Sequence, residues 1–121
     1  MIIEATRNFN AKELEELFQA AQLKLNTSSA VIQSAMLHSS TVIAAYDDNH
    51  KLVGIIRSLD DGCWRAYIDC MIIHKEHWGT DLADRLVAAL LEALKGVPII
   101  NISPNEERNY DIYKRFGLIK E

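Results

Sequence analysis

Several titratable side chains gather around one strand–turn–helix segment of the sequence, and they are the first candidates for chemistry. Asp69 lies within an apolar run, and His74 and His77 flank the polar turn that follows. An ionised carboxylate on a buried strand needs a partner, so Asp69 is an ion-pair residue, an exposed edge residue or a general base. The histidines could relay a proton or bind phosphate. Their spacing fits no metal site, and we expect both to be solvated turn residues.

The same segment has the form of an anion-binding unit. Ala66–Ile73 is a near-continuous apolar run typical of a strand covered on both faces, and Asp81–Lys95 carries a leucine stripe of helical period. The unpaired N–H groups of a first helical turn and the positive end of the helix dipole favour an anion such as phosphate. Such units are also ordinary structural material in α/β proteins, so a purely structural role stays open.

Length and composition are those of a soluble globular domain. The 121 residues are 49% hydrophobic and 25% charged, so we expect one domain over residues 1–121. No apolar run reaches the roughly 18 residues of a membrane span, and the N-terminus lacks a signal-peptide pattern, which predicts a cytoplasmic protein without a membrane partner. The formal charge of −4 without a basic stripe argues against nucleic acid. Cys63 and Cys70 are expected to be reduced thiols.

Periodicity and turn signals predict the other elements. Asn10 begins a capping box at the start of the first helix, and a polar link near residue 48 is typical of a hairpin. Because a crossover through a helix is right-handed, the strand after Lys95 should lie parallel to Ala66–Ile73. Ser103-Pro104-Asn105-Glu106 has the pattern of a helix start, and Gly117 should end that helix. The expected elements are strands Ile2–Ala5, Thr41–Tyr46, Lys51–Arg57 and Val97–Ile102, and helices from Asn10 to about Leu25, from Thr27 to about His38 and from Ser103 to Gly117.

These elements predict an α/β (α+β) fold, in which an antiparallel meander covered on one face is joined to a parallel pair of strands and flanked by helices. The order of elements resembles that of the GNAT acyltransferase superfamily over nearly the whole chain. The resemblance is carried by the segments Lys51–Arg57, Ile72–Leu86 and Asp111–Leu118. It implies a GNAT-like mixed sheet with acetyl-CoA as cosubstrate, wedged where Ala66–Ile73 and Pro98–Ile102 splay apart. The pantetheine arm would pair with the backbone around Ile72 and Ile73 as if it were a strand.

The family's phosphate turn, Gln/Arg-x-x-Gly-x-Gly/Ala, falls on a six-residue stretch that is therefore expected to bind the cofactor: Trp78, Gly79, Thr80, Asp81, Leu82 and Ala83. Ala83 and Gly79 agree with the family, whereas Trp78 stands where Gln or Arg is usual and Asp81 replaces the central glycine. A carboxylate at this helix start stabilises the free helix but repels a pyrophosphate. We therefore expect weak binding of acetyl-CoA.

The resemblance also implies catalytic roles near the C-terminus. Tyr113 matches the tyrosine that protonates the leaving thiolate, and Asn105 falls near the family's asparagine at the start of this helix. Judged by its helical spacing alone, Tyr113 would simply pack with Tyr110 and Phe116. Asp69 is the candidate general base, and backbone N–H groups of its strand would stabilise the oxyanion.

The expected reaction is transfer of the acetyl group to an amine of a small molecule or protein by direct attack. The alternative is a GNAT-fold protein without catalysis that acts as a CoA sensor or a protein-interaction module. The chain ends four residues after Gly117, which leaves a sheet edge that could pair with a second subunit, so a homodimer is a further hypothesis.

Overall fold

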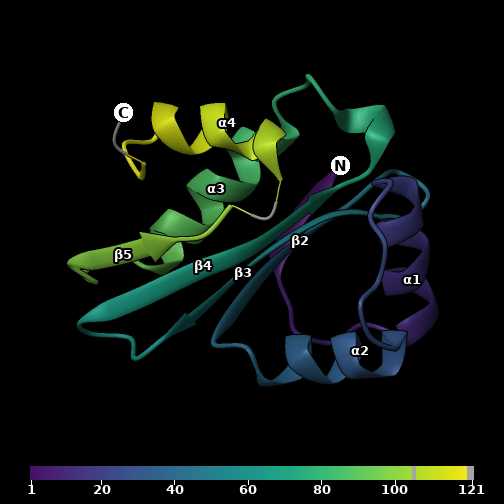
Figure 1. The fold of residues 1–121 in the computed structure, drawn as a ribbon, viewed down its shortest axis with the longest axis horizontal. Helices are drawn as coiled ribbons and strands as arrows, with labels where there is room; N and C mark the ends of the chain where they lie inside the picture. The colour runs from purple at the N-terminus through teal and green to yellow at the C-terminus, as the bar shows by residue number, and fades with distance from the viewer. Residues whose placement is uncertain (105, 120–121) are drawn as a thin grey trace.

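A five-stranded sheet in the order β1-β2-β3-β4-β5 runs through the computed structural model, which describes residues 1–104 and 106–119 (Figure 1). Neighbouring strands are antiparallel except for β4 and β5, which are parallel. The expected meander with one parallel pair is thus confirmed. The strands are β1 (Ile2–Ala5), β2 (Thr41–Tyr46), β3 (Leu52–Asp60), β4 (Arg65–Ile73) and β5 (Ile99–Ile102).

Helices cover both faces of this sheet. As Figure 1 shows, α1 (Ala11–Ala20) and α2 (Ser29–His38) lie on one side, and α3 (Leu82–Ala93) and α4 (Tyr110–Arg115) on the other. Successive strand residues therefore enter different cores: Val42 packs toward α1 and α2, and Ile43 packs with residues of α3. The expectation of a meander covered on one face was wrong. Its strands are nearly continuous apolar runs, and such runs need cover on both sides.

Local signals set some element ends, and tertiary contacts set others. The capping box is confirmed, since Asn10 Oδ1 accepts from Glu13 N at 2.7 Å and Glu13 Oε2 accepts from Asn10 N at 2.9 Å. The first helix nevertheless ends at Ala20, because Gln22 adopts a left-handed φ of 60°. Within the part of the chain that the structure describes, no helix is both long and apolar enough to cross a membrane.

The start of the last helix was predicted wrongly. Glu106 has extended backbone angles, so the short helical turn η2 (Glu107–Asn109) and then α4 begin after it rather than at Ser103. The end was predicted correctly, since Gly117 has a φ of 73°. A second helical turn, η1 (Lys75–His77), links β4 to α3.

One extra residue in β4 changes how its far half is used. Arg57 pairs with Cys70 and Ser58 pairs with Ile68, so Asp69 is a β-bulge without an opposite residue. Before the bulge, Ile68 directs its carbonyl to β5, where it accepts from Ser103 N at 3.0 Å. Beyond Ile68, β4 continues without β5 as its neighbour.

The pairing beyond the bulge decides which main-chain groups face the space left by β5. His74 N donates to Val53 O at 2.9 Å, so alternate residues back to Cys70 direct their main chain toward β3. Met71 and Ile73 therefore direct their N–H and C=O groups to the opposite edge, which we call the open edge of β4 because β5 does not pair along it. Of the two residues expected to pair with pantetheine, Ile73 faces the open edge and Ile72 faces β3.

Candidate functional site

A pocket of about 640 Å³ lies between the end of β4, the turn before α3 and the helix α4. Six of the residues predicted to bind the cofactor line it: Ile73, Trp78, Gly79, Thr80, Asp81 and Ala83. Two others, Ile72 and Leu82, are 2% and 1% exposed and belong to the cores beneath the pocket. Asn105 lies outside the described residues. The phosphate turn and the open edge of β4 thus share one cavity.

The turn before α3 is stabilised by the Thr80 hydroxyl and the conformation of Gly79 rather than by the carboxylate of Asp81. Gly79 takes a φ of 78°, and the Thr80 hydroxyl donates to His77 O at 2.6 Å while accepting from Leu82 N at 3.3 Å. Asp81 is the N-cap of α3, so this helix begins at Leu82 rather than Asp81, yet its carboxylate makes no capping hydrogen bond. The exposed carboxylate therefore contributes mainly its charge.

The pocket carries charges of both signs. Arg115 of α4 donates to Asp84 of α3, and Arg108 also lines the cavity, as do Asp81 and Asp111. Two arginines thus face three aspartates. An anion here gains from the helix dipole and the guanidinium groups but is repelled by the carboxylates. Sequence reasoning missed both arginines. Arg108 lies in η2 and Arg115 in α4, and the only indication in the sequence was that the last helical segment carries basic side chains.

Trp78 ties the turn to the strand. Its Nε1 donates to Ile73 O at 2.9 Å, and the Arg108 guanidinium lies 3.4 Å from its ring centroid. Arg108 Nε is in turn 3.2 Å from Glu106 Oε1. A residue that is unusual for the family motif therefore has specific partners on β4 and at the start of the last helix.

Tyr113 is buried in the core under α3 and does not line the pocket. Its side chain is 1% exposed and belongs to the same core cluster as Met71 and Ile73. Burial raises the pKa of the Tyr113 phenol above its usual range, and neighbouring Cys70 and Asp69 contribute to the rise. The hydroxyl thus keeps its proton at neutral pH, as a proton donor must.

Asp69 forms an ion pair at the bulge. Its two oxygens accept from Arg57 Nε and Nη2, each at 2.8 Å, and Arg57 Nη1 also donates to the buried Ser39 at 3.3 Å. The hydrogen bonds that Arg57 donates to Asp69 raise the pKa of the Arg57 guanidinium, which therefore stays charged. The structure thus realises the ion-pair interpretation of Asp69, with its carboxylate next to the point where β4 and β5 diverge.

The two histidines of the turn differ in burial. His74 is 7% exposed, and its Nδ1 accepts from Glu76 N at 3.1 Å. Burial lowers the pKa of His74, which favours this neutral acceptor. The expectation of a solvated turn residue was wrong for His74, because its ring is buried and accepts a hydrogen bond as the N-cap of η1. His77 lines the pocket.

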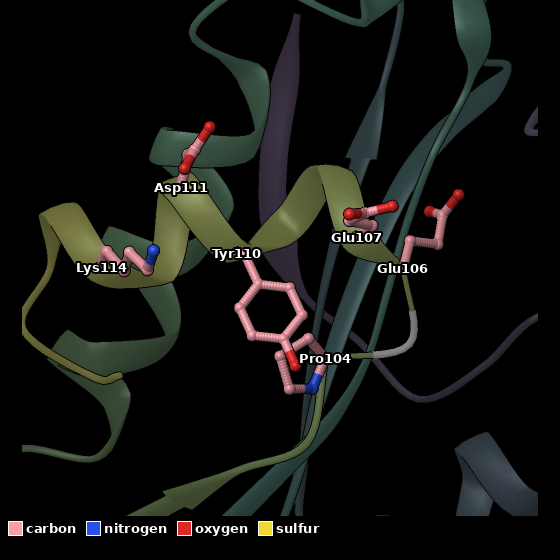
Figure 2. A pocket seen from close by; sticks show the side chains of 6 residues that line it. All are labelled: Pro104, Glu106, Glu107, Tyr110, Asp111 and Lys114. Carbon is pink, nitrogen blue, oxygen red and sulfur yellow. The ribbon is translucent and has the colours of Figure 1, made fainter. Parts of the chain in front are cut away.

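A second hollow of about 670 Å³ lies on another face of α4. Figure 2 shows Tyr110 directed toward Pro104 across this hollow, and Glu106 is among the residues that line it. The Glu106 carboxyl has a raised pKa because it is buried, although Arg108 opposes the rise. Glu106 is a second carboxylate near the divergence of β4 and β5 that sequence reasoning missed.

Comparisons with known proteins agree on one family. The acetyltransferase (GNAT) family model matches residues 4–118. An uncharacterized N-acetyltransferase of Pyropia yezoensis is 28% identical over 98% of this chain and 70% of its own length. A GNAT family acetyltransferase of Streptococcus pneumoniae superposes with a TM-score of 0.81 at 20% identity, covering 98% of this chain and 86% of that one.

An aminoglycoside N-acetyltransferase solved in complex with CoA has a TM-score of 0.71 at 12% identity, covering 98% of this chain and 88% of that one. Likeness at such identity concerns the fold. The family match carries the identification: the chain belongs to the acetyltransferase (GNAT) family. Its activity is therefore that of an N-acetyltransferase, which acts on amine substrates, and a fold kept without catalysis is not favoured.

Proposed function

We propose that this chain binds acetyl-CoA in the pocket between β4, α3 and α4 and transfers the acetyl group to an amine of a small molecule or protein. The observation that carries the proposal is the divergence of β4 from β5 after Ile68: beyond it the main chain of Met71 and Ile73 faces away from β3, and Ile73 lines a cavity that ends at the start of α3. A strand-like ligand with an anionic end fits both features.

The chain's own groups supply the remaining chemistry. The amine nitrogen attacks the thioester carbonyl, and a backbone N–H of β4 stabilises the developing negative oxygen. As the C–S bond breaks, the neutral Tyr113 phenol donates its proton to the sulfur and recovers one from water. The proton lost by the amine passes to a carboxylate, Asp69 as first predicted or Glu106, whose raised pKa suits a proton acceptor.

Tyr113→Phe tests this proposal. In the purified protein with a panel of amines, thiol release from acetyl-CoA should show kcat lowered on the order of 10² to 10⁴, with affinity for acetyl-CoA nearly unchanged. Tyr110→Phe is the matched control, because Tyr110 is 43% exposed on the same helix. Thiol release that no amine stimulates would refute the proposed reaction, and an unchanged kcat would remove Tyr113 from it.

We also propose a cytoplasmic homodimer. Both cysteines are free thiols, as a reducing compartment favours. In the described sheet β5 is an edge strand, and such an edge offers main-chain groups for pairing with a second copy. A monomeric mass in solution at high protein concentration would contradict the dimer.

A further inference from the structure

Side chains occupy hydrogen-bonding positions along the open edge of β4. Ile73 O accepts from Trp78 Nε1 at 2.9 Å, and Met71 O accepts from Asn109 Nδ2 at 3.4 Å. The two carbonyls are two residues apart on one edge, the spacing at which a neighbouring strand would place its N–H donors. An indole and an amide thus stand where a strand-like ligand would donate.

Burial fixes the side chain of Asn109, and a contact with Arg108 fixes that of Trp78. Asn109 is 1% exposed at the end of η2, so its amide is fixed within the structure. The ring of Trp78 is covered by Arg108, which is itself paired with Glu106. The bond from Trp78 has an ordinary length, whereas that from Asn109 is long and therefore weaker. Trp78 is the stronger of the two contacts.

We propose that Trp78 and Asn109 close the open edge of β4 in the ligand-free protein and must release it when acetyl-CoA binds. This rests on the proposed acetyl-CoA site. Amide N–H groups of the ligand then replace the indole and the side-chain amide on the two carbonyls, and Trp78 moves away from Ile73. Affinity for CoA is accordingly reduced by the hydrogen bonds that the protein must first break.

Trp78→Phe separates the hydrogen bond from the ring. Phenylalanine can keep the contact with Arg108 but has no N–H donor for Ile73 O. The loss of one net hydrogen bond from the ligand-free state should tighten CoA binding roughly 2- to 12-fold. Asn109→Ala should act in the same direction, and the double variant should bind more tightly than either single variant. Circular dichroism and thermal unfolding establish that each variant is folded.

Trp64→Phe serves as the control for CoA affinity and as the variant in which fluorescence reports on Trp78 alone. Trp64 is 57% exposed before β4, and the chain has two tryptophans, so this variant leaves Trp78 as the sole indole fluorophore. Its CoA affinity should equal that of the wild type, and its emission should change as CoA saturates the site. An unchanged emission at saturation would overturn the proposal, even if the other variants failed to fold.

Titration calorimetry with CoA distinguishes the closing of the open edge by Trp78 and Asn109, which we call the cap, from the proposed function. Tighter CoA binding by the folded variants Trp78→Phe and Asn109→Ala, or binding by these variants alone, supports the cap. Equal or weaker binding by them overturns the cap while leaving the acetyl-CoA site in place. If neither the wild type nor the double variant binds CoA or acetyl-CoA, both the cap and the proposed function fail.

Discussion

The charge of Asp81 should limit affinity for acetyl-CoA, and Asp81→Asn removes that charge with little other change. Asp81 is the exposed N-cap of α3, lines the pocket and makes no capping hydrogen bond. Asparagine is an equally good N-cap residue, so the helix loses only the favourable dipole term of about 0.3 to 1 kcal/mol. The substitution therefore isolates the electrostatic effect on the ligand.

The size of the effect follows from Coulomb's law. A carboxylate about 5 Å from a pyrophosphate charge, at an effective dielectric of about 20, is repelled by roughly 3 kcal/mol. Because Asp81 is exposed, salt near 0.15 M with a Debye length of about 8 Å reduces this to roughly 1.5 kcal/mol. Asp81→Asn should therefore tighten acetyl-CoA binding by about tenfold.

Titration calorimetry at low and moderate salt measures this gain, which should shrink as salt rises. Glu92→Gln is the matched control, since it removes the same charge from an exposed position near the other end of α3, roughly 16 Å along the helix. Affinity in the control should stay within about twofold of the wild type. If Asp81→Asn binds acetyl-CoA no better than the wild type, Asp81 does not face the phosphates.

Three further predictions concern stability. Gly54→Ala would bring a Cβ to 2.9 Å from Leu86 Cδ1, so chemical denaturation should show a loss of about 1 to 3 kcal/mol, partly recovered by Leu86→Val. Burial raises the pKa of Cys70 from 9.0 to about 12. The thiol thus ionises first in the unfolded chain, and between pH 8.5 and 11 the wild type should lose about 2 kcal/mol more than Cys70→Ser. Equal losses would refute this. Asp69→Asn should cost about 1 to 3 kcal/mol by leaving Arg57 poorly paired, and unchanged unfolding would show that the ion pair contributes nothing.

The sequence predicted those features that depend on nearby residues. The capping box at Asn10 and the stop at Gly117 are set within one helical turn, so their residue types suffice. The order of the strands from β2 to β5 and the parallel pair followed from periodicity and crossover handedness, whereas the place of β1 in the sheet was not predicted. The stretch from Trp78 to Ala83 was chosen by its resemblance to the family's phosphate turn; most of its residues line the pocket, and their binding of phosphate stays a prediction.

Features that depend on distant contacts were missed. Ser103-Pro104 resembles a helix start, but Glu106 remains extended, with its carboxylate beside Arg108, and the helix begins later. The bulge at Asp69 has no local marker, because it exists only in the pairing with β3. The contact of Trp78 with Arg108 joins two segments 30 positions apart in the sequence. Local patterns carry no information on such pairings.

The bulge makes the pairing of β4 with β3 sensitive to where a residue is added or removed. Deleting Asp69 would leave the pairs on either side of it unchanged, so Met71 and Ile73 would keep their main-chain direction and their place in the core under α3. Inserting one residue into β3 opposite Asp69 would instead give Asp69 a partner and reverse the alternation beyond it. Ile72 would then present its carbonyl to the pocket, and Met71 and Ile73 would turn their side chains from the core under α3 to the core under α1. The open edge and both cores therefore tolerate loss of the bulged residue but not a residue that pairs with it.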